Sequence, residues 1–217
     1  PSPYDEAVRQ SWYLENVFYH AAPELYGRVA QTLDDASAEA LSEQLISIGF
    51  WPGGDRDGNP FVDAKTTWHV AERLRMTLLR CYRREIRDLR RRITFKHVSS
   101  QLDLLQDQIE FAMLHPDDKR LSVVSLSEKL EEVAVWVEEH SNGLYLSKIR
   151  GFQFKLRLFG LHFASLDIRQ DSRVIQHALR SALSAGGQDL AVYEAMAPNE
   201  KVDFLMSADL PADVDGV

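Results

Sequence analysis

At 217 residues, with 45% hydrophobic and 27% charged residues, the chain has the composition of a globular protein that can bury a core. Its formal net charge of −8 argues against a general nucleic-acid binder, because affinity for a phosphate backbone needs a basic face. The single cysteine excludes an internal disulfide framework and favours a cytoplasmic location, and no apolar run approaches the length that spans a bilayer.

Residues 1–60 are predicted to form helices followed by a glycine-rich loop. Apolar residues recur at helical spacing over 5–31, and a second helix is expected over about 37–47. Residues 51–60, W-P-G-G-D-R-D-G-N-P, cannot continue a helix or an ordinary strand, because glycine opens backbone conformations closed to other residues and proline fixes its own φ. A loop with this many special residues is typical of binding or catalysis.

The charged residues of this loop permit two interpretations. Asp55 and Asp57 resemble the start of an EF-hand loop, but glycine stands fourth instead of sixth and Thr66 occupies the position of the required Glu, so calcium binding of that type is excluded. The spacings of phosphate-binding glycine loops are also absent. The loop either serves function or is a structural turn in which Arg56 bridges the two carboxylates before a helix.

Residues 61–140 are predicted to form a helical hairpin insertion. Asp63 can cap a long helix that ends near residue 92, and the apolar spacing over 95–114 predicts an antiparallel partner. Ser125-x-x-Glu128 is a capping-box pattern for a further helix. Nine arginines lie between 73 and 92, but interleaved acidic residues favour a solvated or acid-paired face over a nucleic-acid surface.

Residues 141–217 are predicted to form a helix, a strand and C-terminal helices. After the turn at Asn142-Gly143, a helix should run through Phe159. The short apolar run over 161–168 is bounded by glycine and by a polar segment, which favours a buried strand. Further helices are expected from about 172 to 184, near 188–196 and near 199–206, with a frayed tail after Pro211.

A carboxylate stands at the C-terminal end of this predicted strand. Asp167 is followed by Arg169, Gln170 and the start of a helix. Strand ends direct functional groups into the sites of α/β enzymes, and helix N-termini favour anions, so the segment fits an active site. In the structural alternative, Asp167 pairs with Arg169 or caps the next turn.

The two segments together resemble phosphoenolpyruvate carboxylase. The glycine loop is similar to the family's S-W-M-G-G-D-R-D-G-N-P motif, and F-G-L-H-F-A-S-L-D-I-R-Q-D-S to its barrel-strand motif, with weaker likeness over 3–16 and 142–160. The resemblance implies a mainly α fold: a helix-rich internal segment of a (β/α)₈-barrel enzyme, of the short bacterial form, with about two short barrel strands near 49–55 and 161–168.

The resemblance also implies a reaction and a site. The family carboxylates phosphoenolpyruvate with bicarbonate to oxaloacetate and phosphate, an anaplerotic fixation of carbon dioxide that feeds the tricarboxylic acid cycle, and it requires Mg²⁺ or Mn²⁺. The metal ligands would be Asp167 and Glu131, and Arg56 would either contact substrate or brace the loop. The other implied roles are catalytic for Arg56, Asp55, Asp57 and Arg169, and substrate-binding for Trp51 and Gln170.

Several family features have no counterpart here. The T-A-H-P-T-E segment with the catalytic histidine is absent, as are the family's phosphate-binding glycine loop and its C-terminal arginines. The isolated chain is therefore expected to be inactive. The resemblance also implies that the parent enzyme is a homo-oligomer, usually a tetramer. The competing hypothesis is a helical interaction or scaffold module without catalysis.

Overall fold

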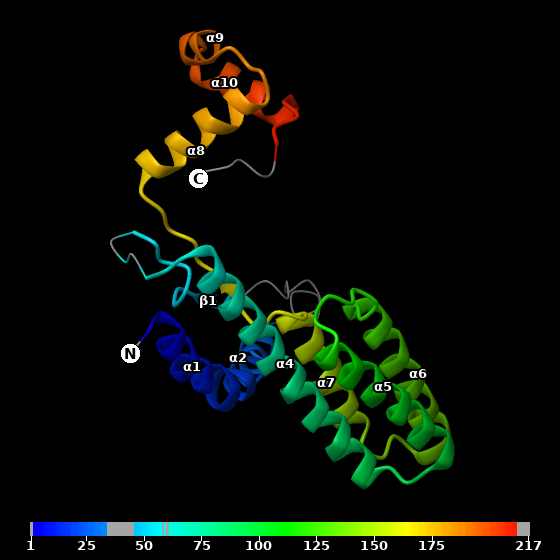
Figure 1. Cartoon of the computed structure of the whole chain (residues 1–217). Helices are drawn as coiled ribbons and strands as arrows, with labels where there is room; N and C mark the ends of the chain where they lie inside the picture. Colours follow the sequence, from blue (N-terminus) through cyan, green and yellow to red (C-terminus); the bar gives the residue numbers. More distant parts are fainter. Residues whose placement is uncertain (1, 34–45, 58, 60, 212–217) are drawn as a thin grey trace.

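The computed structural model describes residues 2–33, 46–57, 59 and 61–211, and helices dominate it (Figure 1). The described residues contain two strands of two residues each, so the predicted mainly α fold with about two short strands is confirmed. Most of the predicted helix over 37–47, and the tail after Pro211, lie outside the described residues. Within those residues, no helix combines the length and the apolar character needed to cross a membrane.

The N-terminal helix predicted over 5–31 is confirmed, with a π-helical segment in its middle. α1 covers Pro3–Tyr13, η1 covers Leu14–Phe18 and α2 covers Tyr19–Ala30. The start is fixed by a capping box, in which the Ser2 hydroxyl accepts a hydrogen bond from the Asp5 amide and the Asp5 carboxylate accepts one from the Ser2 amide. Tyr19, directly after η1, is buried in the core.

Four helices form an antiparallel bundle joined by short connections. α4 covers Ala64–Arg92, α5 Lys96–Leu114, α6 Val123–Ser141 and α7 Leu146–Phe159. Successive helices contact each other and α7 returns to α4, which closes the bundle. The predicted long helix, its cap at Asp63 and its antiparallel partner are confirmed. The helices of 61–140 thus share one core with α7.

The predicted start of α6 is wrong by three residues. Ser122 is the cap, because its backbone is extended and its hydroxyl accepts the amide hydrogen bond of Ser125 at 3.0 Å. Ser125 already lies in the first helical turn and cannot itself act as the cap. The end of the helix is marked by Asn142, which adopts a left-handed conformation with φ of 51°.

Many arginines of α4 join helices together. Arg84 pairs with Glu15 of η1 at 2.7 Å, Arg83 with Glu110 of α5 at 3.8 Å, and Arg90 with Asp103 of α5. Arg92 pairs within α4 with Asp88 at 2.9 Å. The prediction of an acid-paired face is confirmed at these positions, and these guanidinium groups are engaged by carboxylates of the same chain.

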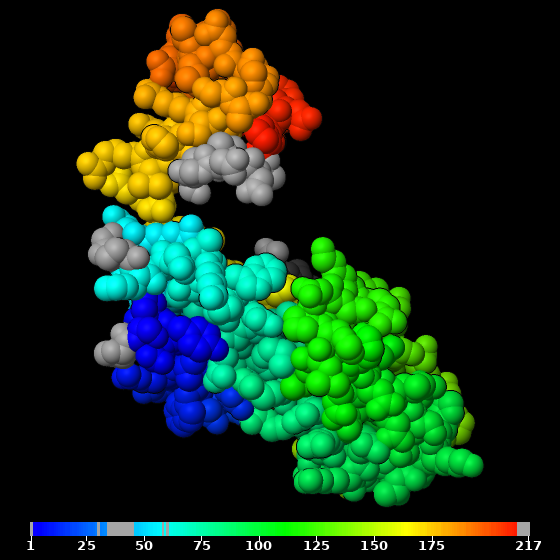
Figure 2. Space-filling view, in the orientation of Figure 1, coloured from blue at the N-terminus to red at the C-terminus, as the bar shows by residue number. Residues whose placement is uncertain are grey.

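The C-terminal helices form a unit that projects from the helical body (Figures 1 and 2). α8 covers Ser172–Ala185, α9 Leu190–Ala195 and α10 Pro198–Ser207, in agreement with the predicted ranges. α8 is capped by Asp171, whose carboxylate accepts the Arg173 amide hydrogen bond at 2.8 Å. The segment 167–171 links this unit to the body (Figure 1).

A buried hydrogen bond fixes the end of α7. The Tyr82 hydroxyl, fully buried on α4, donates to the Gly160 carbonyl oxygen at 2.7 Å. Gly160 has φ of 58° and ψ of −126°, a conformation that glycine adopts readily. From this point the chain turns towards the second strand, so the bond links the bundle to the segment that carries Asp167.

We expect Tyr82→Phe to lower the free energy of unfolding by about 1–2 kcal/mol, because it removes a buried hydroxyl and leaves the half-buried Gly160 carbonyl without this donor. Urea denaturation of the purified chain measures the change. Tyr13→Phe is the matched control, since the Tyr13 side chain is 56% exposed, and it should change stability little. Equal stability of the two variants would contradict the prediction.

Candidate active site

Two segments far apart in the sequence are joined by parallel backbone hydrogen bonds. β1, Gly49–Phe50, pairs with β2, Ser165–Leu166, so that Gly49 lies beside Ser165 and Phe50 beside Leu166. The amide of Ser165 donates to the carbonyl of Ile48 at 2.9 Å, and the amide of Asp167 to that of Phe50 at 2.8 Å. These bonds place the glycine loop directly against the Asp167 segment.

The pairing continues past the strands into the loop itself. The Arg169 amide donates to the Gly54 carbonyl at 3.0 Å, and the Arg56 amide donates to the Arg169 carbonyl at 2.9 Å. Asp55 and Arg169 consequently form a parallel bridge. The two motifs singled out in the sequence are therefore one structural unit, which is called the ladder below: residues 48–56 and 165–169.

The adjacent glycines of the loop are required by close approach. A Cβ atom on Gly54 would lie 2.2 Å from the carbonyl oxygen of Asp167, which is closer than any real contact. Gly53 has φ of 79°, and a Cβ atom there would lie 2.5 Å from the side chain of Val70 on α4. Glycine at position 54 lets the Asp167 segment approach the loop, and glycine at position 53 lets α4 approach it.

The predicted strand over 161–168 is wrong in length and in burial. Only Ser165 and Leu166 form a strand, and neither is buried. Phe163 takes the buried position, with φ of 69° and its ring 5.1 Å from that of Phe159. A left-handed residue interrupts the extended backbone, so the apolar run divides into an aromatic anchor followed by a short strand.

Asp167 presents an exposed carboxylate beside Gly49. A Cβ atom built on Gly49 would lie 3.1 Å from Oδ2 of Asp167, so the side chain lies over the first residue of β1. Among the described residues, no side chain donates a hydrogen bond to this carboxylate and Arg169 does not pair with it. The next helix is capped by Asp171. The described residues therefore show neither a pairing of Asp167 with Arg169 nor a helix cap formed by Asp167.

Arg56 joins the loop to α4. Its Nη2 donates to the Thr67 hydroxyl at 3.0 Å, and that hydroxyl donates to the Asp63 carbonyl at 3.1 Å. A turn in which Arg56 bridges Asp55 and Asp57 is not what forms. The catalytic role and the brace role of Arg56 both stay predictions. Sequence reasoning missed Thr67 because a threonine in a helical first turn carries no local signal of its long-range partner.

The other predicted site residues are divided between the ladder and its surroundings. Trp51 opens the loop and is 48% exposed. Arg169 is exposed on the ladder, and its guanidinium has no partner in the described part of the chain. Gln170 accepts the amide hydrogen bond of Asp171 at 3.0 Å, so it shapes the entry to α8. The ladder thus brings together Trp51, Asp55, Asp167 and Arg169.

Glu131 lies elsewhere. It belongs to α6, where it accepts hydrogen bonds from Arg150 and Gln153 of α7. The Arg150 hydrogen bond lowers the pKa of Glu131 below its ordinary value of 4.5. The structure does not bring Glu131 and Asp167 together, and the contacts of Glu131 are those of an interhelical ion pair.

Among the described residues, Asp167 is not joined by further metal-binding side chains. Divalent magnesium and manganese prefer several oxygen ligands, and Asp167 supplies one carboxylate. The described ranges contain no group of three or more His, Cys, Asp or Glu side chains that could hold a metal ion. The metal-ligand roles of Asp167 and Glu131 stay predictions.

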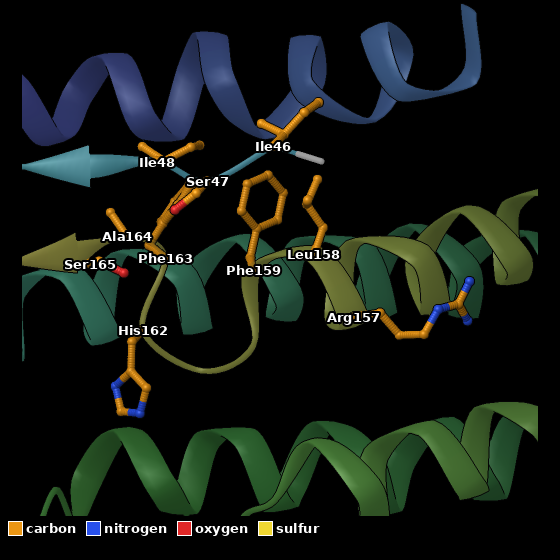
Figure 3. Close-up of a pocket in the computed structure, with 10 residues that line it drawn as sticks. All are labelled: Ile46, Ser47, Ile48, Arg157, Leu158, Phe159, His162, Phe163, Ala164 and Ser165. Carbon is orange, nitrogen blue, oxygen red and sulfur yellow. The ribbon is translucent and has the colours of Figure 1, made fainter. Parts of the chain in front are cut away.

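A hollow of about 560 Å³ lies at the N-terminal ends of β1 and β2, away from the glycine loop and Asp167. It is lined by residues that precede β1 and β2 and by the end of α7 (Figure 3). Ile46 and Ile48 approach Phe159 and Phe163 across it, whereas His162 points away from these rings (Figure 3). Both apolar side chains and polar ones, among them Arg157 and His162, line this hollow. The exposed charges of the ladder lie at the other ends of the two strands.

Comparison with known proteins gives a consistent result. The family model described as phosphoenolpyruvate carboxylase matches residues 1–129 and 108–211. A phosphoenolpyruvate carboxylase of Shewanella loihica is 28% identical over 210 residues, covering 80% of this chain and 23% of the relative. One of Prochlorococcus marinus is 27% identical over 271 residues, covering 95% of this chain and 27% of the relative. The chain spans about a quarter of the length of these relatives.

We expect Gly54→Ala to lower the free energy of unfolding by about 3 kcal/mol or more, because the added methyl group would overlap the Asp167 carbonyl and break the ladder. Gly151→Ala is the matched control, since this glycine lies inside α7 with nothing within 4 Å of its Cβ position. It should stabilise the chain by up to about 1 kcal/mol. Urea denaturation compares both with the wild type, and a neutral Gly54→Ala would contradict the geometry.

We expect Glu131→Gln to lower the free energy of unfolding near neutral pH by less than about 1 kcal/mol, because the ion pair is half exposed. The folded-state pKa is lowered, so this contribution is present above the ordinary pKa of 4.5 and disappears as the pH falls through the folded-state pKa. Denaturation of both proteins across the acidic range measures the difference. A difference that grows on acidification would refute the ion-pair assignment.

Proposed function

The chain belongs to the phosphoenolpyruvate carboxylase family, and from that membership we propose that it forms part of an enzyme that carboxylates phosphoenolpyruvate. Bicarbonate is the second substrate, and oxaloacetate and inorganic phosphate are the products. Transfer of the phosphoryl group to bicarbonate gives carboxyphosphate and the enolate of pyruvate. Carboxyphosphate then breaks its bond between carbon and the phosphate oxygen, which releases carbon dioxide and inorganic phosphate, and the enolate carbon bonds to that carbon dioxide. Because the chain spans about a quarter of its relatives, the proposal concerns an assembled enzyme to which this segment contributes.

One observation supports the proposal above the others: the ladder joins the glycine loop to the Asp167 segment. The ladder carries exposed side chains of both charges, Asp167 and Arg169, and its loop half carries the exposed Trp51. Reactions of phosphate esters depend on positioned charges more than on covalent chemistry by the protein. A rigid backbone frame that holds such groups together suits this requirement.

Residues of the ladder, and Asp57 and Gln170 next to it, have roles in this proposal. The Arg169 guanidinium binds an oxygen pair of phosphate or carboxylate, for which its planar fork of donors is suited. Trp51 forms a wall that keeps water from the enolate. Asp55 and Asp57 orient the loop and its ligand, and Arg56 holds the loop on α4 through Thr67. Gln170 sets the direction in which the chain leaves the ladder.

The cofactor, assembly and location follow from the family. We propose Mg²⁺ or Mn²⁺ as the cofactor, with Asp167 able to offer one oxygen ligand. The enzyme is proposed to be a cytoplasmic homo-oligomer. The free, buried Cys81 is compatible with the cytoplasmic location and does not bear on the oligomeric state. A non-catalytic helical module stays the competing hypothesis, and it would tolerate the loss of Arg169.

The test is a chimera in which this chain replaces the matching segment of the Shewanella loihica enzyme. Oxaloacetate formation is measured with purified protein whose folding is checked by circular dichroism. Arg169→Gln is expected to reduce kcat/KM about a hundredfold, because it removes charge-assisted hydrogen bonds to the substrate.

The matched control is Arg173→Gln, whose side chain is exposed and pairs only with Asp171 in the described part of the chain. It should leave kcat/KM nearly unchanged, and the isolated chain should form no oxaloacetate. Equal activity of the two folded variants would refute the role of Arg169 and favour the scaffold hypothesis.

A further inference from the structure

A second hollow of about 600 Å³ lies between three segments of the body. One wall is the first half of α4, another is the connection between α5 and α6, and the third is the connection between α7 and β2. His162 belongs to this third wall and points away from the aromatic cluster of Phe159 and Phe163 (Figure 3). The volume falls within the range of about 300–1,000 Å³ that is usual for small-molecule pockets.

The hollow exposes an aromatic ring. Trp68, on the first turns of α4, is 67% exposed, although tryptophan usually buries most of its surface. Pro116, Leu121 and Leu161 line the same hollow. An indole in a hollow that apolar side chains also line offers a flat surface on which an aromatic or aliphatic group can pack.

Charged groups of both signs line the hollow around this surface. Glu72, Asp117 and Lys119 have no side-chain partner in the part of the chain that the structure describes. Arg75 makes one contact, from Nη1 to the Ala112 carbonyl at 3.4 Å. Asp118 also lines the hollow, but Arg120 already pairs with it at 2.8 Å.

Among the described residues, the lining groups of this hollow that lack an ion-pair partner include two carboxylates, Glu72 and Asp117, and two cations, Arg75 and Lys119. A ligand with only negative charge would be repelled by Glu72 and Asp117. A ligand with only positive charge would be repelled by Arg75 and Lys119. An uncharged apolar ligand would remove water from all four groups without replacing their hydrogen bonds, which is costly. A ligand that carries both charges on an apolar body satisfies every group.

We propose that this hollow binds a small zwitterion with an apolar side chain, of which an aromatic α-amino acid is the simplest example. Its carboxylate pairs with Arg75 and Lys119, its ammonium group pairs with Glu72 and Asp117, and its ring packs on Trp68. The proposal does not depend on the carboxylation reaction, because the ladder contributes no residue to this hollow.

Titration calorimetry of the 217-residue chain with L-phenylalanine tests the proposal. Two probes of the same size each lack one charge: 3-phenylpropionate has no ammonium group, and phenethylamine has no carboxylate. We expect saturable binding of L-phenylalanine, with each probe at least about tenfold weaker, since each lost pairing is a charge-assisted hydrogen bond. Absence of L-phenylalanine binding at tens of millimolar, or equal binding of all three compounds, would overturn the proposal.

Two variants locate the binding in this hollow. Lys119→Gln should weaken binding about tenfold, and Trp68→Ala should weaken it by a similar factor through loss of ring packing. Lys96→Gln, an exposed lysine at the start of α5, is the control and should bind like the wild type. Undiminished binding in both folded variants of the hollow would show that the ligand binds elsewhere, and the site would be refuted.

Discussion

The backbone ladder between residues 48–56 and 165–169 is the constraint on which the candidate active site depends. It explains why Gly54 cannot carry a side chain, since the Asp167 carbonyl occupies that space. It also explains how strands of only two residues each can define a site, because the hydrogen bonding continues beyond the strands into the loop. Asp55 and Arg169 lie beside each other for this reason alone.

The helical bundle supplies the rigidity that so short a pairing lacks. On the side of β1, Val70 packs against Gly53 and Thr67 holds Arg56. On the side of β2, Tyr82 holds the Gly160 carbonyl, and the buried rings of Tyr19, Phe159 and Phe163 pack within 6.0 Å of one another. Both halves of the ladder are therefore attached to α4, the longest helix of the bundle.

Local patterns predicted the helices well because the information they need lies within a few residues. The cap at Asp63 and the apolar spacing of α4 and α5 are such patterns, and both are confirmed. The start of α6 was misplaced because two serines three residues apart both fit a cap, and only the backbone decides between them. The strand over 161–168 was drawn too long because an apolar run does not reveal the positive φ of Phe163.

The candidate site was predictable only in part. That the glycine loop and the Asp167 segment belong together came from a resemblance in sequence, and the structure gives this a physical basis in the ladder. The partner of Arg56 could not be predicted, since Thr67 is brought near by the turn that starts α4. The same limit applies to Glu131, whose pairing with Arg150 depends on how α6 packs against α7.

The attachment of the C-terminal unit has a mechanical consequence. Helices α8–α10 stand out from the body on the segment 167–171, and the first residues of that segment are also part of the ladder (Figure 1). The unit is therefore attached to the body through the residues that carry the exposed charges of Asp167 and Arg169. A force applied to α8 would be transmitted along a few peptide bonds to the Arg169 carbonyl, and so to the glycine loop that it holds.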